Sequence, residues 1–118
     1  MKRFLAVYIG TPMATETSAW NAMSEVERQK VQKEGIAAWH QWVETNKASI
    51  LEIGAPLGRT KSASKKGVAD IRNNMTGFTI VQAESHEAAA KLFEKHPHFM
   101  IFPGEAIDIM ECLPIPGM

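Results

Sequence analysis

Two histidines that flank a proline are the residues of this chain best suited to chemistry. His96 and His98 lie in the stretch FEKHPHFMIFPGEAID, residues 93–108. His96 follows Leu92 and Phe93 at helical spacing, and residues two apart in an extended segment share a face, so the two imidazoles can converge. Because histidine exchanges protons near neutral pH, the pair predicts a proton-transfer site or part of a metal site.

A purely structural interpretation of the same pair is also open. His96 would then cap the last turn of a helix, where an imidazolium is favourable beside exposed carbonyls, and His98 would pack in a loop. A metal site needs three or four ligands, and Glu105, Asp108 or His40 would have to supply those that the pair lacks. We therefore predict no bound metal.

Residues 57–75 concentrate positive charge. They carry one acidic side chain, Asp70, and five basic ones, a net charge of +4 in a chain whose formal net charge is zero. The basic residues are Arg59, Lys61, Lys65, Lys66 and Arg72. A cluster of this kind predicts binding of a small anion or carboxylate, whereas the structural alternative is a solvated loop.

The role of Asp70 depends on its partner. It lies two residues before Arg72, so the simplest interpretation is an ion pair that holds the loop. If Asp70 instead faced a histidine, it would orient the imidazole and raise its basicity. Trp20 lies in an irregular segment and could form a pocket wall, while Trp39 and Trp42 share one helical face, which is more typical of a core.

Composition restricts the class of protein. The chain has 118 residues, 45% apolar and 22% charged, which is typical of a single globular domain spanning residues 1–118. A net charge of zero argues against a nucleic-acid-binding protein. One cysteine excludes an intramolecular disulfide and is compatible with a cytoplasmic location. The sequence has no run of about 20 apolar residues, so we expect no membrane span.

Hydrophobic periodicity predicts the elements that would position these residues. We expect strands over 3–10, 48–56, 76–84 and 106–114, helices from Ser24 to about Asn46 and from Ser85 to Pro97, and irregular structure over 57–75. The order is βαββαβ. This predicts an α+β, ferredoxin-like fold in which two helices cover one face of a four-stranded antiparallel sheet.

The strands are apolar on both faces. In the first strand, Phe4, Ala6 and Tyr8 alternate with Leu5 and Val7. Two helices cover only one face of the sheet, and an apolar sheet face needs a cover. A twofold copy of the chain is the simplest cover, so we predict a homodimer through the open sheet face.

Three segments resemble the YCII-related proteins, which are small dimeric α+β barrels. These segments are Trp20 followed by SEVER at 24–28, GFTIVQAESHEAAAKLFEKHPH at 77–98, and PGEAIDIMECLPI at 103–115. One branch of that family carries Asp-Gly-Pro-Phe before its third strand, where this chain reads ADIRNNMTGF. The resemblance implies a dimeric α+β barrel over nearly the whole chain.

The resemblance also implies an activity. Some members resemble small lyases in which a His–Asp pair is credited with dehydrochlorination, the histidine lying on the first helix, where this chain has His40. We therefore expect a cofactor-free lyase or isomerase acting on a small anionic or phenolic compound; the alternative is a non-catalytic ligand-binding module. The candidate catalytic base is His98 or His40, with Asp70 as its partner. The candidate substrate-binding residues are Arg59, Lys61, Arg72, His96 and Trp20.

Overall fold

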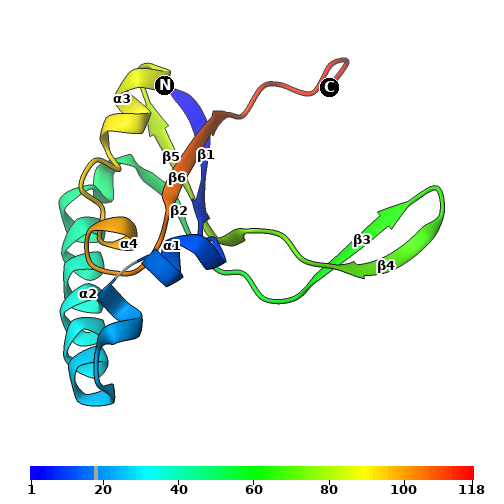
Figure 1. The fold of residues 1–118 in the computed structure, drawn as a ribbon. Coiled ribbons are helices and arrows are strands. Elements are labelled where there is room, and N and C mark those ends of the chain that lie inside the picture. The colour runs from blue at the N-terminus through cyan, green and yellow to red at the C-terminus, as the bar shows by residue number, and fades with distance from the viewer. Residues whose placement is uncertain (18) are drawn as a thin grey trace.

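The computed structural model describes residues 1–17 and 19–118 (Figure 1). The main elements are β1 (Lys2–Ile9), α1 (Pro12–Thr17), η1 (Ala19–Ala22), α2 (Glu25–Thr45), η2 (Lys47–Ser49), β2 (Ile50–Pro56), β3 (Thr60–Ser64), β4 (Gly67–Ile71), β5 (Met75–Ala83), α3 (His86–Lys91), α4 (Pro97–Met100) and β6 (Ala106–Glu111).

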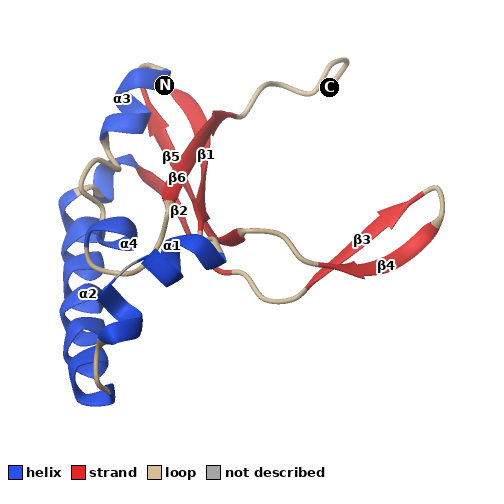
Figure 2. Ribbon diagram, in the orientation of Figure 1, coloured by secondary structure: helices blue, strands red, loops and turns tan. Residues whose placement is uncertain are grey.

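Four strands form one antiparallel sheet in the order β2-β5-β1-β6. Strand β5 lies between β1 and β2, which α2 connects, and β1 lies between β5 and β6, which the segment with α3 connects. The ferredoxin-like arrangement requires this order. Helices α2 and α3 lie on the same side of this sheet (Figure 2). The predicted α+β, ferredoxin-like architecture is therefore confirmed.

Local sequence explains the long helix and its orientation. The Ser24 side chain caps α2 by accepting a hydrogen bond of 3.2 Å from the backbone amide of Glu27, as predicted from the SEVE sequence. On the sheet side, Trp39 and Trp42 pack against a buried core that includes Phe4 and Tyr8. Of the two apolar faces of the first strand, the one with Phe4, Ala6 and Tyr8 faces the helices.

The opposite face of the sheet is apolar. Leu5 pairs with Ile80 on one neighbouring strand and with Met110 on the other. Val7 pairs with Phe78 in the same layer. The Met110 side chain is 43% exposed, and neither α2 nor α3 lies on this side (Figure 2). We call this surface the open face.

No helix in the described part of the chain is long and apolar enough to cross a membrane.

The expectation of irregular structure over residues 57–75 is wrong. Strands β3 and β4 pair as a separate two-stranded sheet, joined by a tight turn at Gly67, whose φ is +108°. Glycine adopts this backbone conformation without steric cost. The hairpin projects well beyond the main sheet (Figure 1). We call residues 57–75 the arm.

The second predicted helix is shorter than expected, and a separate turn follows it. Helix α3 ends at Lys91, and Lys95 adopts a left-handed conformation with φ 57°. Pro97 then starts α4, since proline is favourable at the first helical position. Between β1 and α2, the predicted loop instead contains α1 and η1.

Candidate functional site

An apolar cavity of about 440 Å³ lies between α2 and the main sheet. Its wall combines aromatic rings from three segments, Tyr8 of β1, Trp39 of α2 and Phe102 after α4. The rings of Tyr8 and Trp39 are 5.0 Å apart, and those of Trp39 and Phe102 are 6.2 Å apart. We call this space the inner cavity. Its lining suits a small, flat, largely apolar molecule.

Two hydroxyl groups supply polarity at the sheet side of the inner cavity. Thr79 Oγ1 donates to the carbonyl of Ile53 at 2.9 Å, so the Tyr8 hydroxyl donates to Thr79 Oγ1 at 2.7 Å. Burial raises the pKa of Tyr8, and the hydrogen bond with Thr79 partly opposes that shift. Tyr8 therefore stays protonated, and its oxygen retains lone pairs that can accept a hydrogen bond.

His96 is a buried residue, and it does not carry the charge that the structural interpretation of the sequence assigned to it. It is 0% exposed and caps the start of α4, where its Nδ1 accepts from the backbone amide of His98 at 3.0 Å. Burial, reinforced by His98, lowers the pKa of His96 to about 3. The ring is thus neutral, not an imidazolium at a helix end. None of the three cavities described here is lined by His96, so its predicted contact with substrate is not supported.

The neutral His96 ring carries its proton on Nε2, because Nδ1 is an acceptor. Nε2 is buried and has no hydrogen-bond partner among the described residues. The indole rings of Trp39 and Trp42 meet this imidazole edge-on, with ring centroids 4.4 Å and 4.7 Å away. The ring is therefore held by aromatic packing and by the Nδ1 hydrogen bond.

His98 lines the inner cavity and a second cavity beside it. Its Nε2 lies 2.8 Å from the carbonyl of Ile9, so the neutral ring donates from Nε2. Nδ1 is then the lone-pair nitrogen. Burial lowers the pKa of His98, and the carbonyls of Ile9 and Ala106 oppose the shift. Gly104 packs against the ring so closely that an added Cβ would overlap it.

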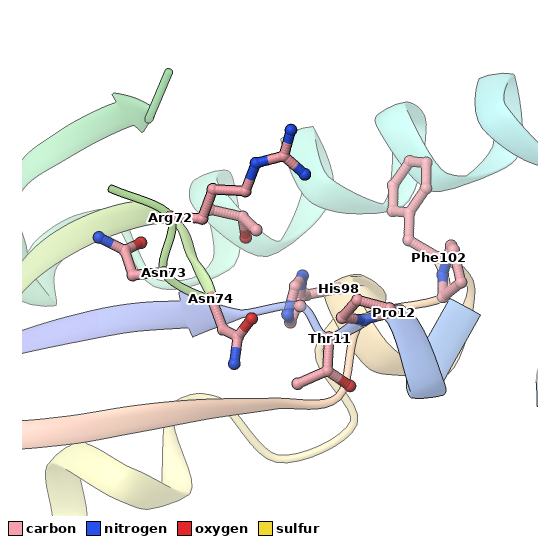
Figure 3. A pocket seen from close by; sticks show the side chains of 11 residues that line it. Thr11, Pro12, Arg72, Asn73, Asn74, His98 and Phe102 are labelled. Atoms are coloured by element: carbon pink, nitrogen blue, oxygen red, sulfur yellow. The ribbon is translucent and has the colours of Figure 1, made fainter. Parts of the chain in front are cut away.

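The second cavity, of about 650 Å³, is more polar (Figure 3). We call it the outer cavity. Arg72, Asn73 and Asn74 of the arm form one side, and Thr11 lies across from them. His98 lies between these two sides, as Figure 3 shows. An anionic group here would meet a guanidinium and amide donors beside a neutral imidazole.

The other predicted site residues are distributed over three places. His40 is an exposed residue of α2 that lines the inner cavity. Trp20 is half-buried in η1, with its ring 6.4 Å from that of Phe102. Arg59, Lys61 and Asp70 line a third cavity, of about 1010 Å³, at the arm.

Asp70 has a different partner from those expected. Its Oδ1 lies 2.7 Å from Nζ of Lys61 on the paired strand, where Lys61 and Asp70 are opposite residues. The predicted Asp70–Arg72 pair is thus wrong. Asp70 also lines the arm cavity, whereas His40 and His98 line the inner cavity, so the structure does not bring a His–Asp pair together.

Sequence reasoning missed Tyr8 and Thr79 as site residues. They are 71 positions apart, and they meet because Tyr8 pairs with Gly77 and Ala6 with Thr79 on adjacent strands. The available signal was that Tyr8, the single tyrosine of the chain, shares a strand face with Phe4 and Ala6; which face packs on the helices is decided by the tertiary structure. Among the described residues, no group of three or more His, Cys, Asp or Glu side chains is placed to hold a metal ion.

Among comparisons with known proteins, only the comparison with solved structures finds similarity. No protein-family model matches the chain, and no curated protein matches it. A solved structure of 5-chloro-2-hydroxyhydroquinone dehydrochlorinase from Burkholderia phenoliruptrix AC1100, in complex with 2,5-dihydroxybenzoquinone, matches with a TM-score of 0.52. The identity is 20%, and the match covers 92% of this chain and 90% of the other. The two chains share a fold.

Proposed function

We propose that the protein is a YCII-related lyase or isomerase that acts without a cofactor on a small aromatic or phenolic compound. The observation that carries the proposal is the inner cavity, which has largely aromatic walls and is lined by Tyr8, His40 and His98. The fold shared with a dehydrochlorinase is consistent with lyase chemistry at this level. The adjacent Arg72 would favour a substrate with an anionic substituent.

In this proposal a histidine acts as the general base. Nδ1 of neutral His98 takes a proton from a hydroxyl group, or from a tetrahedral carbon in a keto tautomer of the substrate, and the electron pair left behind forms a new double bond. In elimination, the leaving group departs with its bonding electrons from a tetrahedral carbon adjacent to the π system that receives this pair, and the imidazolium then releases its proton to water. In isomerisation, the imidazolium returns the proton to a second carbon. Neither reaction has a net change in oxidation state, so no redox cofactor is required.

A second candidate function is binding without turnover. The polar groups of the inner cavity are largely satisfied within the protein, because Thr79 donates to Ile53 and His98 donates to Ile9. Such groups can orient a ligand while taking no part in a reaction.

His40 is the alternative base if the protein is catalytic, because this exposed residue of α2 lines the same cavity.

A ligand screen followed by a turnover assay tests the proposal. Phenols, hydroquinones, halogenated hydroquinones and small carboxylates are scored by thermal shift, then by halide release or ultraviolet absorbance change. His98→Gln should lower turnover by about 10²-fold or more, the usual contribution of a general base. His86→Gln, which changes a histidine outside all three cavities, is the control.

The pH profile of turnover identifies the base. Because burial lowers the pKa of His98, the acid limb of activity should lie below pH 6.5, the ordinary histidine value. Equal losses in His98→Gln and His86→Gln would contradict the assignment of His98. A ligand that binds with no conversion would favour the non-catalytic function.

Gly35→Ala should weaken ligand binding at the inner cavity with little change in stability. A Cβ at Gly35 would overlap the ring of Phe102, which must then move from the cavity wall. Alanine raises helix propensity by about 1 kcal/mol, which offsets part of the strain. We expect an approximately tenfold increase in Kd, or about 1.4 kcal/mol, by calorimetry with a compound from the screen. An unchanged Kd would show that Phe102 does not shape the site.

We also propose that the protein forms a homodimer through the open face. The supporting observation is the continuous apolar layer of Leu5, Val7, Phe78, Ile80 and Met110, which the helices leave uncovered. Twofold packing of this layer on itself would remove it from water.

A further inference from the structure

The arm is an unusual feature of this chain because its two strands form a sheet of their own. Strands β3 and β4 pair with each other, and almost every residue in them is exposed. Val68 is 71% exposed and Ile71 is 45% exposed. A two-stranded hairpin in water is marginally stable by itself, so a surface that covered Val68 and Ile71 would stabilise the arm.

The direction of the arm indicates where that surface lies. Helices α2 and α3 cover one side of the main sheet, while the arm and the segment after β6 both extend on the opposite side (Figure 2). The open face lies between these two projections. A molecule seated on the open face would therefore be flanked by the arm.

The charges of the chain are divided between the arm and the rest. The arm carries +4, so the remainder of the electrically neutral chain carries −4. Within the arm, Lys61 is paired with Asp70. On the open face, the two edge strands contribute exposed carboxylates: Glu52 of β2 is opposite Ile80, and Asp108 of β6 is opposite Val7. Arg3 of β1, opposite Gln82, lies in the same layer and is also exposed, so the charge complementarity with the arm is confined to Glu52 and Asp108 on the edge strands.

We infer that the arm clasps a second copy of this chain, placing its basic side chains against Glu52 and Asp108 of that copy. The inference rests on the open-face homodimer proposed above and adds to it a second, electrostatic contact on each side of the twofold axis. Lys65 and Lys66 at the tip and Arg59 near the base provide the cations, and Val68 and Ile71 provide apolar contact area. Each chain gives one arm and receives one.

A charge-exchange experiment tests the arm directly. One full-length variant carries Lys65→Glu and Lys66→Glu, and the other carries Glu52→Lys and Asp108→Lys. All four positions are exposed, so both variants should fold, which far-ultraviolet circular dichroism checks. Each variant alone should dimerise at least tenfold more weakly than wild type at low ionic strength, by sedimentation equilibrium. Mixing the two should restore dimerisation as a heterodimer, detected by native mass spectrometry, because both arm contacts are again opposite in charge.

Two controls separate the arm from the sheet contact. Glu34→Lys with Glu94→Lys reverses two exposed carboxylates on the helical side and should leave dimerisation unchanged. Ile80→Lys places a charge in the open face and should abolish the dimer if the sheets pack together. If Ile80→Lys disrupts the dimer while both charge variants dimerise normally, the clasp is wrong and the sheet-packed dimer stands.

Other outcomes would also overturn the clasp. A wild-type chain that sediments as a monomer at all concentrations would refute both the dimer and the clasp. Failure of the mixed variants to form a heterodimer would show that Glu52 and Asp108 do not receive the arm. Tight, salt-sensitive binding of duplex DNA that is lost in Lys65→Glu with Lys66→Glu, with the dimer unaffected, would assign the arm to nucleic acid instead.

Discussion

Replacing Gly54 with alanine should lower the free energy of unfolding by about 3–5 kcal/mol. A single substitution causes a loss of this size only through a few mechanisms, of which backbone strain and steric overlap are two. Gly54 adopts φ +79°, and a Cβ there would overlap the backbone carbonyl of Phe78 on the neighbouring strand. A left-handed conformation costs a residue with a Cβ roughly 1–2 kcal/mol. The steric overlap adds to this, because the obstructing atom belongs to the backbone and cannot rotate away.

The same substitution would also disturb the site. Gly54 lies where the β2–β5 register shifts between Glu52 and Ala55, and it lines the inner cavity. Displacing β2 moves the Ile53 carbonyl that accepts from Thr79. We therefore expect Gly54→Ala to weaken ligand binding as well as folding.

Urea denaturation measures the effect, with Gly58→Ala as the matched control. Gly58 has no atom within 4 Å of an added Cβ. Alanine at such a position should change stability by no more than about 1 kcal/mol, and in the favourable direction if the backbone accepts it. Equal losses of stability in the two variants would show that the close approach of Gly54 to β5 does not exist in solution.

Some elements of this molecule could be predicted from the sequence and others could not. Ser24 and Ser85 cap their helices as local sequence predicts, because a capping hydrogen bond is made within three residues. Alternation also gives the two sets of side chains in β1, with Phe4, Ala6 and Tyr8 on one face and Leu5 and Val7 on the other. Local rules were sufficient for these features.

The arm was missed because its strands lack the signals that identify strands. Thr60–Ser64 and Gly67–Ile71 contain many small or polar residues and show no clear alternation of apolar with polar side chains. Alternation arises when one face of a strand packs on a core, and the arm packs on no core within its own chain. A strand exposed on both faces gives no periodicity to detect.

The site could be predicted in part. Residue type and position indicate His98, and the resemblance to the YCII-related proteins indicates His40; both line the inner cavity. For Asp70 the sequence allows a pair with Arg72 or with a histidine, whereas its partner Lys61 depends on strand pairing within residues 57–75, which no local pattern records. One interpretation of the sequence assigns a charge to His96, whose burial among Trp39 and Trp42 depends on packing between three segments.

The buried His96 should make the stability of the protein fall steeply in acid. Its pKa is about 3 in the folded protein and about 6.5 in the unfolded chain. Between these values the unfolded chain binds a proton that the folded protein does not. The free energy of unfolding is therefore fully retained above pH 6.5 and decreases by about 1.4 kcal/mol per pH unit as the pH falls toward 3. The lowered pKa of His98 acts in the same direction.

His96→Asn isolates this effect. Asparagine is a favourable N-cap and can accept from the His98 amide as Nδ1 does, but it does not titrate. The variant should be less stable at pH 7.5, because the ring no longer fills the space between Trp39 and Trp42. Its stability should nevertheless vary less with pH, so that about 3 kcal/mol of the difference from wild type disappears between pH 7 and pH 4.

Urea titrations of wild type and His96→Asn at half-unit pH intervals measure the two slopes. If the His96→Asn curve is parallel to that of wild type, the imidazole of His96 gains its proton as readily in the folded protein as in the unfolded chain. The ring would then be hydrated, and the aromatic enclosure that separates His96 from the cavities would be open to water.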